Sequence, residues 1–128
     1  MKWLSRTLLL GPYLTLVTSE KEFRRVLKHL NVEDDTPYVR PGWQACTHTY
    51  VQKNGNVACV VALDVEQVGG SDPVDIAALL VHEAVHVWQA IEDTAGDRRN
   101  MFGTEGPAYG IQNISAFLMH EYKDRITQ

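Results

Sequence analysis

The clearest periodic pattern of apolar positions lies between Asp72 and Glu92. Apolar side chains recur there every three or four positions, as the buried face of an amphipathic helix requires; they are Ile76, Leu79, Leu80, Val87, Trp88 and Ile91. Asp72 can cap the first turn, and Pro73 is well suited to the first helical position. The pattern predicts one helix over residues 72–92.

A second helical pattern follows the loop DTAGDRRNMFG and continues to Tyr122. Thr104 can cap this helix, Glu105 lies in its first turn, and Pro107 is tolerated that early in a helix. The expected buried stripe consists of Ala108, Ile111, Ile114 or Ser115, Leu118 and Tyr122. We expect this helix to pack antiparallel to the helix over residues 72–92.

The N-terminal region predicts a strand followed by a helix. Residues 13–17 alternate as a strand does, and Ser19 with Glu22 forms a capping box for a helix over residues 20–30. The opening stretch has a basic start and an apolar run, but Gly11-Pro12 splits that run and no small-residue cleavage site follows. No stretch reads as long enough to span a membrane. We therefore expect a folded N-terminus and a cytoplasmic protein with no membrane partner.

The middle of the chain predicts a β-hairpin. Residues 45–51 and 57–63 are strand-like, and Asn54-Gly55 between them is typical of a two-residue type I′ turn. That turn makes the numbers of paired residues sum to 109. The resulting pairs are Cys59 with Tyr50 and Cys46 with Leu63.

In this register the two cysteines share one face of the sheet but lie too far apart for a disulfide. We therefore expect Cys46 and Cys59 to be reduced thiols. The order of elements predicts an α+β fold, a single domain of residues 1–128 in which a small antiparallel or mixed sheet packs on two helices.

Composition narrows the possible partners. The chain of 128 residues has a net charge of −4 and a pI near 5.7. Its basic residues are scattered, with Arg24-Arg25 and Arg98-Arg99 as the only short pairs. This charge distribution gives no electrostatic basis for binding nucleic acid.

The helix over residues 72–92 carries the most specific chemical pattern in the chain, VHEAVHVW. His82 and His86 are four residues apart, so both imidazoles project from one helical face and can reach a single metal ion. Glu83 lies about 100° further round the helix, where it can contact a water held by that metal. The HExxH pattern is typical of zinc peptidases. A histidine pair of this kind also occurs as hydrogen-bonded core residues, which is the structural alternative.

A catalytic zinc ion needs a third protein ligand. Downstream candidates are Glu92, Asp93, Asp97, Glu105, His120, Glu121 and Asp124. Glu92 and Asp93 are too close along the same helix to fold back on the metal. Glu105 is better placed, because antiparallel packing would aim the start of its helix at the histidine pair; His120 is next in line.

These residues resemble the gluzincin group of zinc peptidases. The pattern HExxH, eighteen further residues and a glutamate runs from His82 to Glu105, and TEGPAY at residues 104–109 echoes a stretch of the aminopeptidase branch. The resemblance covers residues 72–122. It implies a zincin-like fold in which His82, His86 and Glu105 bind one zinc ion and Glu83 is the general base.

The chain also departs from the group's pattern. Thermolysin-type members carry an aspartate four residues after the third ligand, where this chain has Tyr109. Hydrogen-bond support for the histidines is then expected from Asp93, Asp97 or Asn113. The chain has no GxMEN-like exopeptidase motif, so we expect an endopeptidase rather than an aminopeptidase.

The expected function is a zinc-dependent peptidase acting on a peptide or protein substrate. Zinc would polarise the scissile carbonyl and activate a bound water, from which Glu83 takes the proton. Tyr109, His120 and His48 are the candidate donors to the tetrahedral intermediate. The resemblance implies that an edge strand binds the substrate backbone, with Val57–Leu63 as the candidate edge. The alternatives are an inactive zinc-binding scaffold that recognises a protein partner and a hydrolase of non-peptide amides.

Overall fold

The computed structural model describes residues 2–4, 13–95 and 105–127, which form an α+β fold with a small mixed sheet. The elements follow the predicted order. In sequence they are β1 (Tyr13–Val17), α1 (Glu20–His29), β2 (Ala45–Val51), β3 (Val57–Leu63), the short α2 (Val65–Val68), α3 (Pro73–Ala95) and α4 (Glu105–Ile126). The predicted loop DTAGDRRNMFG begins later than expected, because residues 93–95 belong to α3. The rest of that loop, with Asp97 and Arg98-Arg99, and the predicted Thr104 cap lie outside the described residues.

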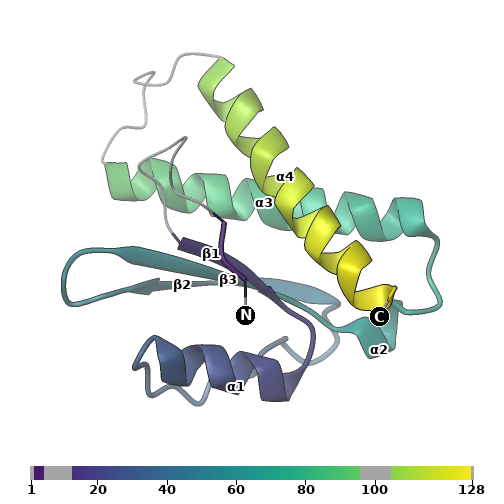
Figure 1. Ribbon diagram of the computed structural model, residues 1–128, viewed down its shortest axis with the longest axis horizontal. Helices are drawn as coiled ribbons and strands as arrows, with labels where there is room; N and C mark the ends of the chain where they lie inside the picture. Colours follow the sequence, from purple (N-terminus) through teal and green to yellow (C-terminus); the bar gives the residue numbers. More distant parts are fainter. Residues whose placement is uncertain (1, 5–12, 96–104, 128) are drawn as a thin grey trace.

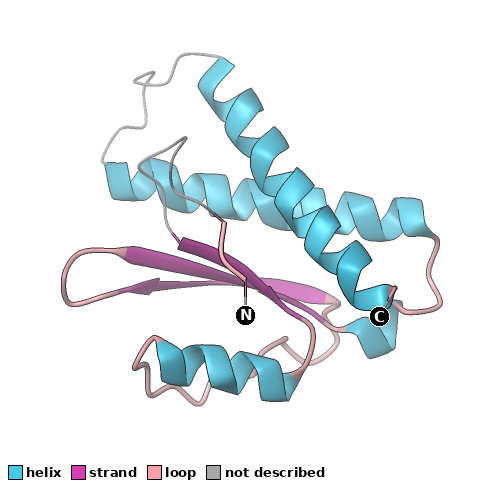
Figure 2. Cartoon of the chain, in the orientation of Figure 1, coloured by secondary structure: helices cyan, strands magenta, loops and turns pink. Residues whose placement is uncertain are grey.

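The sheet has three strands in the order β1-β3-β2. β1 runs parallel to β3, and β2 runs antiparallel to it. β3 is the central strand and every one of its residues is buried, so the expectation that Val57–Leu63 forms a sheet edge beside the HExxH helix is wrong. The run VACVVAL has the uninterrupted apolar character of a central strand, and Figure 2 shows the three strands of the sheet below the long helices. Of the two edge strands, β2 is the one that packs on α3.

The hairpin between β2 and β3 forms, but its register differs by one residue from the prediction. Paired residues sum to 108, so Thr49 faces Cys59 and Cys46 faces Ala62. The Gly55 amide donates to the Gln52 carbonyl at 2.9 Å, and Gly55 has φ of +86°. The loop is therefore a three-residue turn with glycine in the left-handed position, which the same Asn-Gly pair can also form.

The one-residue shift places the two cysteines on opposite faces of the sheet. Cys59 packs in the core cluster with α3 and α4, whereas Cys46 packs in the cluster with α1. Both thiols are free, as predicted, although not on the one face that the predicted register gave them.

Three layers result, with α3 and α4 on one face of the sheet and α1 on the other (Figure 1). The predicted N-caps of α1 and α3 are present: the Ser19 hydroxyl accepts from the Glu22 amide at 3.1 Å, and Asp72 Oδ1 accepts from the Val74 amide at 2.8 Å. The capping box at α1 differs from the prediction in its second half, because the Glu22 carboxylate accepts from the Thr18 amide at 3.1 Å rather than from the Ser19 amide. These caps fix the starts of α1 and α3.

α4 crosses α3 at a close contact between Gly110 and the Trp88 ring, where a Cβ on Gly110 would overlap the indole. Its buried stripe differs in part from the prediction. Ala108 is exposed, while Gly110 and Glu121 are buried with Ile114, Ser115 and Leu118. Glu121 is accommodated because it pairs with Arg125 at 3.2 Å, and Arg125 also donates to the Leu16 carbonyl at 2.9 Å. This network ties the end of α4 to β1.

By length and composition alone, Pro73–Asp93 of α3 meets the requirement for a membrane span, with a mean hydropathy of 1.3. The expectation that no stretch is long enough therefore does not hold. Core helices of soluble proteins share this length and composition.

Candidate metal centre and groove

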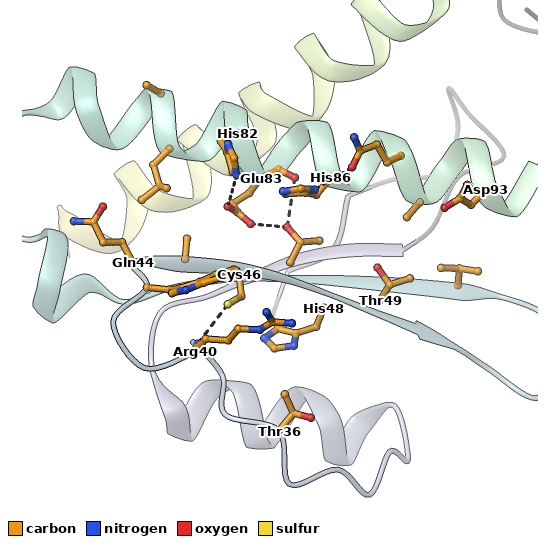
Figure 3. Close-up of a pocket in the computed structure, with 18 of the residues that line it drawn as sticks. Thr36, Arg40, Gln44, Cys46, His48, Thr49, His82, Glu83, His86 and Asp93 are labelled. Carbon is orange, nitrogen blue, oxygen red and sulfur yellow. Dashed lines mark hydrogen bonds and ion pairs between the residues drawn. The ribbon is translucent and has the colours of Figure 1, made fainter. Parts of the chain in front are cut away.

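A groove of about 1210 Å³ lies between α3 and β2 and includes residues on both faces of β2 (Figure 3). From α3 it is lined by Asp75, His82, Glu83, His86, Gln89 and Asp93, and from β2 by residues 45–49 and 51. The predicted HExxH residues thus all line this groove. Its other wall is an edge strand.

His82 and His86 both lie on the exposed, groove-facing side of α3. Their ring centroids are 4.9 Å apart with a 79° angle between the ring planes. The His82 side chain is 65% exposed. The core-histidine alternative therefore does not describe this pair, since neither imidazole is buried.

Glu83 differs from the histidines in being 4% exposed. Its Oε1 accepts a hydrogen bond from the Thr47 hydroxyl of β2 at 2.9 Å, and its Oε2 lies 3.9 Å from Nε2 of His82. The carboxylate is thus held between α3 and the edge strand, beside the imidazoles (Figure 3). Thr47 was not identified from the sequence, because only the β2–α3 packing brings it to Glu83.

Gln89 gives His86 a hydrogen-bond partner. Nδ1 of His86 lies 3.0 Å from Oε1 of Gln89. In the tautomer with its hydrogen on Nδ1, His86 donates to this amide oxygen and Nε2 keeps its lone pair for a ligand. Such support was expected from Asp93, Asp97 or Asn113. The i, i+3 spacing of His86 and Gln89 on one helix is the sequence signal that could have identified it.

Glu105 is exposed at the first residue of α4. Among residues 2–4, 13–95 and 105–127, no group of three His, Cys, Asp or Glu side chains is placed to hold a metal ion. The structure therefore brings His82 and His86 together without Glu105. The segment that leads from α3 into Glu105, residues 96–104, lies outside the described part of the chain.

The three candidate donors to the tetrahedral intermediate lie in different places. Tyr109, which is 62% exposed, and His120 are on α4 and do not line the groove. His48 lines it from the face of β2 away from α3 (Figure 3). There its Nε2 is 2.7 Å from the Tyr38 carbonyl, and its ring packs on Phe23. His48 is thus a structural side chain of the α1 layer.

The outer edge of β2 is open. The Gln44 carbonyl accepts from Asp64 at 2.9 Å and the Gln52 amide donates to Asn56 at 2.7 Å, so the even-numbered residues of β2 bond to β3. The amides and carbonyls of residues 45, 47, 49 and 51 therefore point outward. Within the described ranges, no backbone group pairs with them. An extended chain can add to this edge.

Comparisons with protein-family models, with curated proteins and with solved structures give no match to this chain.

Proposed function

We propose that this protein is a zinc-dependent peptidase of gluzincin type that cleaves within an extended peptide bound along β2. The observation that carries the proposal is the grouping of His82, His86 and the buried Glu83 carboxylate in a groove whose other wall is an open strand edge. A zincin-like arrangement, with a sheet on the HExxH helix and a second ligand-bearing helix, belongs to the same proposal.

The imidazoles of His82 and His86 suit zinc, whereas the described structure does not bring Glu105 to them, so its part as third ligand rests on the resemblance alone. The side chains that would hold the ion are His82 and His86, whose neutral imidazoles are good zinc ligands, and Glu105 as the third ligand. The His86–Gln89 hydrogen bond supports this assignment, because it leaves Nε2 of His86 free to coordinate. When bound, zinc supplies a Lewis acid that polarises the scissile carbonyl and makes water more acidic.

The residues of this chain then have separate roles. Glu83 accepts a proton from the attacking water and passes it to the leaving amine. Thr47 holds that carboxylate in place through its 2.9 Å hydrogen bond. The outward amides and carbonyls of β2 bind the substrate backbone as an added strand.

The test is zinc-dependent cleavage of a mixed peptide library by the purified chain. We expect products from the zinc-loaded protein, loss of cleavage with a chelator, and recovery when zinc is restored. A zinc-loaded protein that binds peptides from the library but cleaves none would overturn the peptidase and favour the scaffold. Cleavage of small amides but of no peptide would favour the third alternative.

A further inference from the structure

We propose that the groove selects peptides with an acidic side chain, which Arg40 binds on the face of β2 away from α3. The inference rests on the proposed function for its occupant, an extended peptide added to the edge of β2. It adds a specificity-determining residue at a position remote from the histidines. Arg40 lies outside the HExxH helix, the second ligand helix and the strands predicted from the sequence.

Arg40 lines the same groove as the histidines but from the other side of the strand (Figure 3). Its backbone amide donates to Sγ of Cys46 at 3.4 Å, and the Trp43 amide donates back to the Arg40 carbonyl at 2.9 Å. The connector that leads to Arg40 is anchored by Arg24, whose guanidinium donates to the carbonyls of Asp34 and Thr36. The backbone at Arg40 is therefore fixed relative to β2.

The Arg40 guanidinium is held in place without a carboxylate. It lies over the Trp43 ring, 4.8 Å from the centroid, an arrangement that leaves its hydrogen-bond donors available. Arg40 is exposed, and no ion pair joins it to a carboxylate in the described part of the chain. The guanidinium fork matches a carboxylate in geometry and charge.

Strand addition determines which peptide side chains reach Arg40. In an antiparallel pair, residues directly opposite each other have side chains on the same face. A peptide residue opposite Thr47 therefore points towards α3, and its two neighbours, opposite Cys46 and His48, point towards the Arg40 side. Arg40 lies on the face reached by those two neighbours, so an acidic side chain at either position is attracted to its guanidinium.

The experiment measures binding rather than cleavage, in a Glu83→Gln background with zinc present so that peptides stay intact. The probes are fluorescein-labelled dodecapeptides of alternating Thr and Ala, each with one Glu, Gln or Lys at a single internal position. We expect Glu to bind about 2- to 5-fold more tightly than Gln, the range for a solvent-accessible ion pair, at positions two residues apart and not at those between. Added salt should reduce the preference.

Arg40→Glu should reverse the preference to Lys at the same positions. Arg25→Glu makes the same charge change at an exposed site on α1, outside the groove, and should leave the preference for Glu unchanged. Equal binding of Glu, Gln and Lys peptides, or a Glu preference that persists in Arg40→Glu, would overturn the inference.

The two proposals fail in distinguishable ways. Arg40-dependent selection by a zinc-loaded wild-type chain that cleaves no peptide supports this inference and overturns the peptidase. Cleavage without any dependence of selectivity on Arg40 supports the peptidase and overturns this inference.

Discussion

At the scale of single residues, the contact that matters most is the hydrogen bond from the Thr47 hydroxyl to the Glu83 carboxylate. A general base works only when it is within hydrogen-bond reach of its proton and correctly aimed. Glu83 is buried, so its orientation depends on the few polar atoms around it. In the proposed mechanism, Thr47 is therefore a positioning residue for Glu83 and not itself a catalytic one.

Two replacements of Thr47 distinguish the effect of its hydroxyl on the rate from the effect of its side-chain size. Thr47→Val keeps the volume but removes the donor, and we expect about a 10-fold loss in kcat with little change in KM, since a hydrogen bond to a charged group is worth roughly 1.5–3 kcal/mol. Thr47→Ser keeps the hydroxyl and should retain most of the rate. Zinc content should be the same in both variants. Equal rates for the Val and Ser variants would show that the hydroxyl does not act on Glu83.

The burial of the Cys59 thiol makes the free energy of unfolding depend on pH in the alkaline range. Burial raises the pKa of its thiol from 9.0 to about 11, so the unfolded chain releases this proton before the folded one does. Stability is therefore complete below pH 9 and falls as pH rises towards 11. At pH 10 the loss should be about 1 kcal/mol. Urea unfolding at pH 7 and pH 10 measures this loss, and the free energy of unfolding should fall less between the two pH values in Cys59→Ala than in the wild type. An equal fall in both proteins would assign the loss at alkaline pH to other groups, such as Tyr50.

At the scale of elements, local signals predicted the helices well. The Ser19 and Asp72 caps and the three- and four-residue spacing of apolar positions depend on neighbours within a few residues, and α1 and α3 follow them closely. The strand order was not predictable in this way, because the pairing of β1 with β3 joins residues 45 positions apart. The hairpin register failed because Asn54-Gly55 suits both a two-residue and a three-residue turn.

The crossing of α3 and α4 depends on the missing side chain of Gly110. A Cβ there would overlap the Trp88 ring, so Gly110→Ala should lower the free energy of unfolding by about 1–3 kcal/mol, the usual cost of overpacking. Gly70→Ala is the matched control, since nothing lies within 4 Å of its Cβ position. Chemical denaturation measures both. A Gly110→Ala variant as stable as the control would mean that the helices do not pack closely at this point.

At the scale of the whole molecule, the sequence predicted which α3 residues lie together in the groove better than it predicted what surrounds them. His82, Glu83 and His86 lie together because a helix fixes their spacing locally. Thr47 and Arg40 reach the same groove only through the long-range packing of β2 on α3 and the path of the connector. Glu105 depends on how α4 is placed relative to α3, which local periodicity does not determine. Its role as third ligand stays a prediction.

The central claim is that Glu83 is a base in a zinc centre rather than a structural carboxylate, and one variant tests it directly. Glu83→Gln keeps the size of the side chain and can still accept from Thr47, but it cannot take up a proton. We predict that Glu83→Gln binds zinc as wild type does and loses at least about 10²-fold in peptide cleavage. The same change at Glu66, exposed on α2, should leave both unchanged. A Glu83→Gln protein that retains its zinc and cleaves peptides at the wild-type rate would contradict the account.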